Sequence, residues 1–109
     1  PYWETRNKKK QLIIPYTLDN NDMRFVANQG FNTGDHFFTY LKDSFDALYE
    51  EGESNPKMMT IGLHCRLIGK PGRINSLKRF LEYVLKHDDV WICKRLDIAK
   101  HWIKNYSNI

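Results

Sequence analysis

The side chains best suited to chemistry follow directly after an apolar run. Residues 58–63 read Met-Met-Thr-Ile-Gly-Leu, His64 and Arg66 come next, and a Gly-Lys-Pro-Gly turn then ends at Arg73. A His can donate and accept a proton near neutral pH, and an Arg can bind a carboxylate or imide bidentately. The pattern predicts an acid–base group at His64 with oxygen-binding cations at Arg66 and Arg73. A His that simply packs under a loop is the alternative.

A second polar loop carries two carboxylates three residues apart, Asp19 and Asp22, with Arg24 beside them. A carboxylate can hold an Arg or a His in one geometry and keep it charged. We therefore expect Asp19 and Asp22 to act indirectly: each would hold an Arg, a His or the loop in place and would not contact a reacting carbon. An Asx-rich turn without chemistry is the alternative.

Regular elements must position these two loops. Apolar runs predict strands, and apolar residues at helical spacing predict helices. The predicted strands are 11–14, 58–63 and 90–93, and the predicted helices are about 37–48, 74–86 and 96–106. The order strand, loop, helix occurs three times, which indicates parallel strands joined by right-handed crossovers. Because three such strands leave two open edges, the sequence is expected to be the last part of a larger α/β domain.

The composition suits a single globular domain. Of 109 residues, 41% are hydrophobic and 14% aromatic, which supports a packed core. The net charge is +4, with much of the excess in residues 6–10. We expect a solvated connector there and no nucleic-acid partner, because the aromatics fall at core spacing. No apolar stretch approaches the ~20 residues that cross a bilayer, and no segment directs export, so we expect a cytoplasmic protein without membrane contact.

The cysteine and histidine spacings do not form a metal motif. Cys65 and Cys93 match no zinc or redox pattern, and we expect them to be reduced, small apolar residues. The chain has no His-x-x-x-His, Cys-x-x-Cys or paired-Asp cluster, and no glycine-rich phosphate loop. We therefore expect no metal site and no cofactor in this chain.

Four segments together resemble a known family: residues 14–25, 30–34, 37–43 and 58–73. They are similar to the carboxyl-terminal portion of the urate-catabolism allantoinases, a branch of the polysaccharide deacetylase (NodB-homology) superfamily. Gly-Leu-His-Cys-Arg-Leu followed by Gly-x-Pro-Gly-Arg is specific to this branch. The resemblance implies that residues 1–109 are the carboxyl-terminal part of one NodB-type α/β domain. They would be the last three βα units of a distorted (β/α) barrel, incomplete in this chain.

The resemblance also implies roles for individual residues. Asp19 and Asp22 match the two acids of an Asp-x-x-Asp-Trp motif, and Met23 stands where the Trp would be, which suits the allantoinase branch. The pair Leu63-His64 resembles a strand end whose His acts as the general acid on the leaving group. Substrate contacts are implied for a further set of side chains: Asn21, Arg24, Arg66 and Arg73.

The implied reaction is hydrolysis of the ring amide of allantoin to allantoate, so the partner would be a small molecule. An N-deacetylase acting on an acetylated sugar is the second interpretation, and an inactive truncated remnant is the third. The superfamily's first three motifs, including its metal ligands, would lie upstream. We therefore expect this chain alone to be inactive, and the complete protein to be a homo-oligomer.

Overall fold

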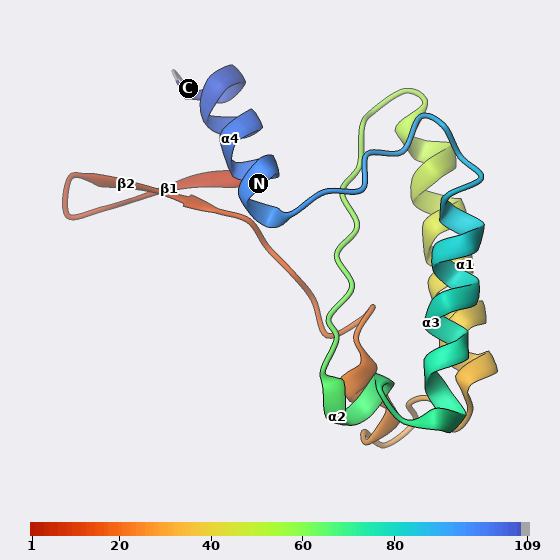
Figure 1. Ribbon diagram of the computed structural model, residues 1–109. Coiled ribbons are helices and arrows are strands. Elements are labelled where there is room, and N and C mark those ends of the chain that lie inside the picture. Colours follow the sequence, from red (N-terminus) through yellow and green to blue (C-terminus); the bar gives the residue numbers. More distant parts are fainter. Residues whose placement is uncertain (108–109) are drawn as a thin grey trace. The chain divides into compact units, whose positions relative to one another are not determined.

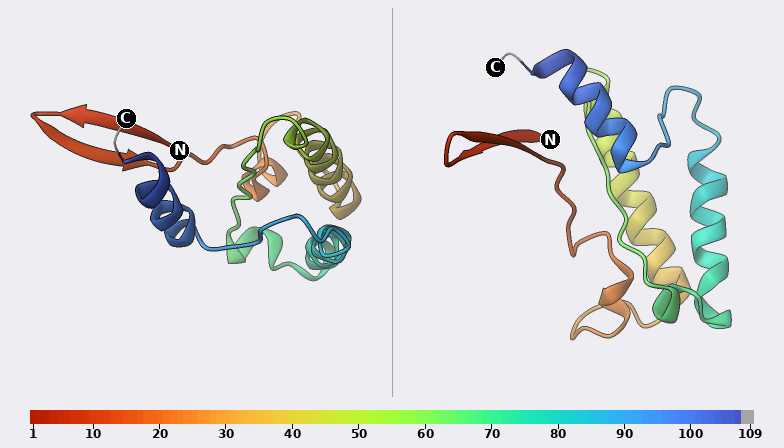
Figure 2. Two further views of the ribbon diagram at one scale, coloured as in Figure 1. Left: turned by 90° about the horizontal axis from the view of Figure 1, so that it is seen from above. Right: turned by 60° about the vertical axis from the view of Figure 1, so that its left-hand side comes forward.

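The computed structural model describes residues 1–107 and divides into two compact units (Figures 1 and 2). One unit combines residues 1–15 with the chain from Trp91 onward, and the other is formed by Tyr16–Val90. No helix in the described part of the chain is long and apolar enough to cross a membrane. That residues 1–109 belong to a single domain stays a prediction.

The smaller unit contains an antiparallel hairpin and a helix. Strand β1 (Tyr2–Arg6) pairs with β2 (Lys9–Ile13), so that Tyr2 lies opposite Ile13 and Arg6 opposite Lys9. Helix α4 (Arg95–Tyr106) is joined to the hairpin by a hydrogen bond of 2.8 Å from Trp3 Nε1 to the Tyr106 carbonyl. The two residues between the strands, Asn7 and Lys8, have φ angles of 52° and 60°. Two positive φ values are the signature of the tight turn that matches the twist of a hairpin.

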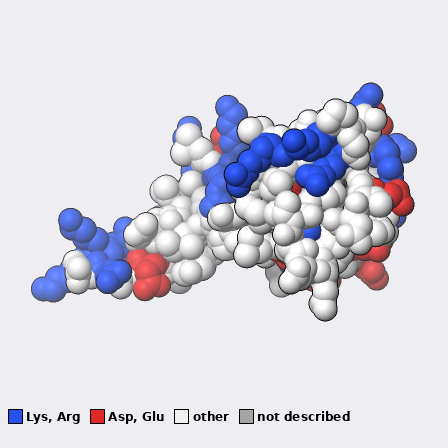
Figure 3. Space-filling model, turned by 90° about the horizontal axis from the view of Figure 1, so that it is seen from below, with Lys and Arg blue, Asp and Glu red and all other residues white. Residues whose placement is uncertain are grey.

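The basic residues predicted to form a connector lie at this hairpin turn. Residues 6–10 are all exposed, and Figure 3 shows the Lys and Arg atoms gathered at the outer end of the hairpin. The prediction that they are solvated is confirmed. Their secondary structure was not foreseen, because β1 was not predicted at all.

The larger unit is built on two helices that run side by side in the same direction, α1 (Gly34–Gly52) and α3 (Pro71–Val84) (Figure 1). The Thr33 hydroxyl caps α1 by accepting from the His36 N–H at 3.1 Å, as Thr commonly does at a helix N-terminus. The helix ends at Gly52.

The interface between α1 and α3 forms the core, because the apolar positions of both helices recur at helical spacing and face each other. Its centre is Phe37, which is fully buried, with Phe80 only 2% exposed. The remaining buried members of this cluster are Phe31, Leu41, Phe45, Ile68 and Val84. Ring pairs such as Phe45–Phe80, with centroids 6.2 Å apart, meet edge to face, an arrangement favoured by aromatic quadrupoles.

Two short helices lie near the start of α3 and carry the candidate site. One is the 3₁₀ helix η1 (Asp22–Phe25), and the other is α2 (Cys65–Ile68). The segment between α1 and α2 is extended and approaches η1 at one point, where Asn21 and Gly62 form a parallel bridge. This bridge is the contact that brings the two predicted functional loops together.

The predicted pairing of the three strands is wrong within residues 1–107. Strand 11–14 occurs as β2, but its partner is β1 and the pairing is antiparallel. Segment 58–63 has only the bridge at Gly62, and 90–93 has no strand. Apolar, β-prone residues favour an extended backbone, but a strand also needs a neighbouring backbone to bond. The fold class itself is confirmed as mixed α/β.

The predicted helices are confirmed, with part of their apolar surface left exposed. Leu81 of α3 is 42% exposed, and Leu85, directly after the end of α3, is 68% exposed. Leu96 and Ile103 of α4 are 61% and 49% exposed. Helix α4 has no buried residue. These side chains belong to the predicted apolar faces, so this part of the chain presents more apolar surface than its own core covers.

Candidate active site

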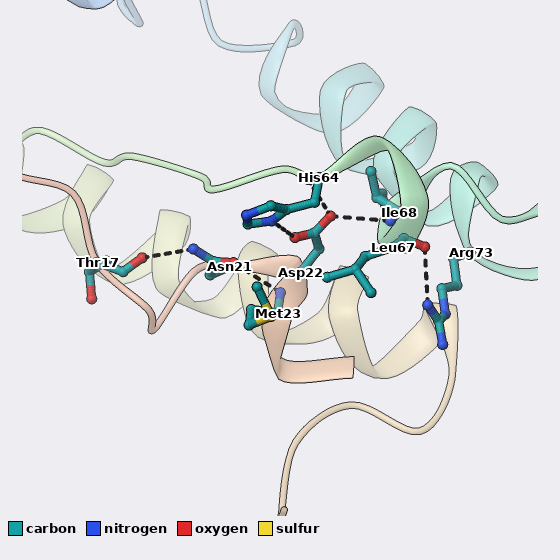
Figure 4. Close-up of polar contacts among 8 residues, drawn as sticks. All are labelled: Thr17, Asn21, Asp22, Met23, His64, Leu67, Ile68 and Arg73. Carbon is teal, nitrogen blue, oxygen red and sulfur yellow. Dashed lines mark hydrogen bonds and ion pairs between the residues drawn. The ribbon is translucent and has the colours of Figure 1, made fainter. Parts of the chain in front are cut away.

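Asp22 is the anchor of the candidate site. Its side chain is fully buried and accepts three hydrogen bonds (Figure 4). Oδ2 accepts from the backbone N–H of His64 at 2.6 Å and of Ile68 at 3.1 Å, and Oδ1 contacts Nδ1 of His64 at 2.7 Å. One carboxylate therefore holds the backbone at both ends of α2 and the His64 ring at the same time.

The sequence around Asp22 explains why this carboxylate is buried there. The amide oxygen of Asn21 accepts from the Met23 N–H at 2.9 Å, and this caps η1. On the other side, the N–H of Asp22 donates to the Gly62 carbonyl at 3.0 Å, and the N–H of Gly62 donates to the Asn20 carbonyl at 2.9 Å. A local cap and a long-range bridge together turn the Asp22 side chain toward α2.

His64 is held at one ring nitrogen and open at the other. As a carboxylate Asp22 can only accept, so we assign a proton to Nδ1. The His64 side chain is 41% exposed, and in Figure 4 its second ring nitrogen points away from Asp22. Nε2 is thus left available for proton transfer. A buried carboxylate behind an exposed imidazole is a common way of fixing the tautomer and orientation of a catalytic His.

Asp19 belongs to a different cluster, which holds Arg24. The Arg24 guanidinium contacts Asp19 Oδ1 at 3.4 Å and donates to the Asp19 carbonyl at 3.2 Å. It also lies over two rings, 4.6 Å from the Phe31 centroid and 4.4 Å from the Tyr40 centroid. The Tyr40 hydroxyl donates to Asp19 Oδ1. Asp19 and Arg24 therefore hold each other, and that Asp19 and Asp22 act only indirectly in a reaction stays a prediction.

Of the residues predicted to contact the substrate, some already form hydrogen bonds within the protein and one is exposed to solvent. Asn21 is 1% exposed and both ends of its amide are hydrogen-bonded, with Nδ2 donating to the Thr17 carbonyl at 3.4 Å. Arg73 donates to the Leu67 carbonyl at 3.1 Å and lies 4.4 Å from the Phe25 ring. Arg66 is exposed on α2. A substrate contact by any of these residues stays a prediction.

Both cysteines are free in the structure, and Cys65 is exposed beside His64. Burial raises the pKa of the Cys93 thiol, with a smaller contribution from Asp97. In residues 1–107, His, Cys, Asp and Glu form no group of three or more that could hold a metal ion. The Asp22 carboxylate is already occupied by three hydrogen-bond donors, so it does not fit a metal ion in its present state. That metal ligands lie upstream in the complete protein stays a prediction from the family resemblance.

Sequence reasoning missed two residues that shape the site. Gly62 forms the bridge to Asn21, and its signal was visible as a glycine inside an apolar strand-type run, which often marks a close backbone approach. Tyr40 was assigned only to a helix, and nothing in its spacing predicts a hydrogen bond to Asp19.

Comparison with known proteins shows which proteins this chain is similar to. The chain superposes on a crystal structure of Puue allantoinase with a TM-score of 0.92 and 59% identity over 96% of its length. A structure of a probable polysaccharide deacetylase from Pseudomonas aeruginosa PAO1 matches with a TM-score of 0.91 and 57% identity over 96% of the chain. The chain is homologous to the carboxyl-terminal portion of the polysaccharide deacetylase and Puue allantoinase proteins.

Sequence comparison adds a further relative and defines the extent of the match. A polysaccharide deacetylase homologue of Schizosaccharomyces pombe is 46% identical over 112 residues, which cover 94% of this chain. No family model matches the chain. The match covers 35% of the yeast relative and 35–36% of the two solved chains. The chain thus spans about a third of the length of the relatives that it matches.

Proposed function

We propose that this chain is the carboxyl-terminal part of an allantoinase-like hydrolase that opens a cyclic amide by cleaving its C–N bond. The observation that carries the proposal is the pair formed by Asp22 and His64, 2.7 Å apart, with one ring nitrogen of His64 left open. It lies in a chain that is 59% identical to Puue allantoinase. The substrate proposed from that relative's name is allantoin, and the product is allantoate.

In the proposed mechanism His64 supplies a proton to the leaving nitrogen. Water adds to the ring carbonyl, and the tetrahedral intermediate collapses with cleavage of the C–N bond. The proton on Nε2 of His64 passes to the departing nitrogen, while Asp22 keeps Nδ1 protonated and favours the imidazolium that must exist before transfer. We assign no base for the attacking water to this chain. Arg66, which is exposed on α2 next to His64, is our candidate for binding a ring or ureido oxygen.

An N-deacetylase is the second candidate, because two of the relatives carry polysaccharide deacetylase names. The chemistry of His64 would be the same, since an amide nitrogen leaves in both reactions. The substrate would then be an N-acetylated sugar and the product would be acetate. The allantoinase proposal includes a role in purine catabolism, a cytoplasmic location and a homo-oligomeric complete protein. The two free cysteines support a reducing compartment.

A chimaera tests the proposal directly. Residues 1–109 would replace the matched third of Puue allantoinase, where 59% identity and a TM-score of 0.92 support a compatible junction. We expect the chimaera to hydrolyse allantoin and the variant His64→Gln to lose ~10²–10⁴-fold in kcat. The matched control is His101→Gln, the same change at an exposed histidine of α4.

The proposal fails if His64→Gln keeps kcat within a few-fold of the parent chimaera while allantoin is still consumed. Release of acetate from an N-acetylated chito-oligosaccharide, without hydrolysis of allantoin, would favour the deacetylase instead. A loss of activity in His101→Gln as large as that in His64→Gln would show that the effect is one of folding.

A further inference from the structure

Gly62 lies so close to Asn21 that no other residue fits there without movement. A Cβ atom at position 62 would lie 2.2 Å from Asn21 Nδ2 and 2.7 Å from its Cγ. Atoms this close must separate to about 3.4 Å to reach an ordinary contact. The absence of a side chain at Gly62 is therefore a condition for the close approach of the two segments.

Asn21 cannot move aside at low cost. Its side chain is 1% exposed, its Oδ1 accepts from the Met23 N–H at 2.9 Å, and its Nδ2 faces the Thr17 carbonyl at 3.4 Å (Figure 4). Rotating the amide away from Gly62 would break both contacts inside a buried site, where an unpaired polar group costs about 1–3 kcal/mol. An added Cβ would therefore push the two backbones apart.

The same two residues set the distance between the catalytic partners. Asp22 follows Asn21 directly, and His64 comes two residues after Gly62, so the bridge lies immediately behind the Asp22–His64 pair. The separation needed to accommodate a Cβ is 1.2 Å, the difference between 2.2 Å and 3.4 Å. If only half of it reached Asp22, the contact of 2.7 Å with His64 Nδ1 would stretch beyond the ~3.2 Å limit of a good hydrogen bond.

We propose that Asn21 and Gly62 form a positioning pair, which sets the hydrogen bond between Asp22 and Nδ1 of His64 and thereby the tautomer of the proton donor. The inference rests on the proposed function and deepens it. It gives Asn21 a positioning role in place of substrate binding, and it adds Gly62 to the residues on which the reaction depends. Neither side chain touches the reacting atoms.

The test compares three variants by the state of the imidazole. Gly62→Ala introduces the clash, and Gly62→Ala with Asn21→Gly removes the amide that is struck, at a position where glycine is an acceptable helix cap. Gly72→Ala is the matched control, because a Cβ there meets nothing within 4 Å. His-selective ¹⁵N labelling of the chimaera reports whether Nδ1 or Nε2 of His64 carries the proton, at a pH where the ring is neutral.

We expect the parent and Gly72→Ala to show the Nδ1–H form and Gly62→Ala to shift toward Nε2–H. In the chimaera, Gly62→Ala should lower kcat at least tenfold with KM within threefold. The double variant should return the Nδ1–H signal and most of kcat. An unchanged tautomer in Gly62→Ala, or no return in the double variant, would overturn the positioning pair. If Gly62→Ala does not fold, a folded double variant with the Nδ1–H signal supports the proposal, and one without it refutes it.

The readouts separate this inference from the proposed function. The imidazole signal is measured without substrate, so an unchanged tautomer rejects the positioning pair whatever the chimaera does. A tautomer that shifts as expected while kcat stays constant leaves the positioning pair standing and rejects His64 as the proton donor.

Discussion

Asp22→Asn is the most informative single substitution in this chain, because it keeps the shape of the side chain and changes what it can accept. Asp22 is fully buried, and its Oδ2 receives two backbone N–H groups, from His64 and Ile68. An Asn oxygen can keep both of these donors. The amide NH₂ then occupies the place of Oδ1, where it donates and can no longer accept from Nδ1 of His64.

The expected result is an inverted tautomer in a protein that still folds. Nδ1 of His64 becomes the acceptor, and the proton moves to Nε2. Hydrogen bonds to a charged group contribute ~1.5–3 kcal/mol and neutral ones about 1 kcal/mol, so we expect the substitution to cost about 1–3 kcal/mol of stability. In the chimaera, which is larger than this chain, such a loss lowers Tm by several degrees. Without a carboxylate to support the imidazolium, turnover in the chimaera should fall ~10²–10⁴-fold.

Three measurements follow the substitution together. Thermal unfolding by circular dichroism gives Tm, ¹⁵N spectra of the imidazole give the tautomer, and allantoin consumption by the chimaera gives kcat and KM. Asp22→Ala serves as the comparison, because it removes the acceptors altogether and leaves the His64 N–H without its partner. We expect this variant to lose about 2–5 kcal/mol, more than Asp22→Asn.

The reasoning is refuted if Asp22→Asn keeps both the Nδ1–H tautomer and a turnover near that of the parent. Asp22 would then serve only the backbone at the start of α2. A variant that loses turnover with an unchanged tautomer would show that the negative charge matters and the orientation of the ring does not.

Three further predictions concern stability and assembly. Burial pushes the pKa of Asp46 upward, but hydrogen bonds from Lys42 and Tyr83 outweigh it and leave the pKa below its ordinary value. The stabilisation from the ionised Asp46 is therefore fully present above the unfolded-state pKa near 3.8, and it is lost as pH falls through the lowered folded-state pKa. Asp46→Asn should lower the free energy of unfolding by less than ~1 kcal/mol at pH 7. At the acid end of a pH series of denaturant unfolding curves, the substitution should have no measurable effect. Phe80→Ala, at a position only 2% exposed, should cost ~3–5 kcal/mol in the same denaturant assay, and a loss below 1 kcal/mol would contradict the assigned core. Exposed apolar side chains on α3, on α4 and directly after the end of α3, where Leu85 is 68% exposed, lead us to expect that the isolated chain is oligomeric or molten and inactive. A sharply folded monomer, seen by light scattering and near-ultraviolet circular dichroism, would argue against it.

Much of the helical framework was readable from the sequence, because helix formation depends on local spacing. The apolar period predicted all three long helices, and the core positions Phe37 and Phe80 lie within the ranges that it predicted. The candidate His64 was also found locally, as a side chain with acid–base chemistry at the end of an apolar run. The resemblance to the allantoinase branch then supplied a role for it.

The strands could not be predicted in the same way, since a strand is defined by a partner that the local sequence does not name. The run 58–63 is apolar and extended, yet within it only Gly62 forms a β-bridge. The run 11–14 pairs with β1 in the antiparallel direction. The two positive φ angles at Asn7 and Lys8 decided that pairing. Of these two residues only the Asn is typical of such a turn.

The sequence by itself determined which side chains can do chemistry: one His, two carboxylates and several Arg on two polar loops. Only the tertiary structure decided how they combine. It brings Asp22 into contact with His64, 42 positions away in the sequence. It pairs Asp19 with Arg24 and Tyr40. It also buries Asn21 against Gly62. The physical reason is that residue type fixes what a side chain can donate or accept, whereas its partner depends on which backbones meet. Here that meeting is set by a single parallel bridge and the missing side chain of one glycine.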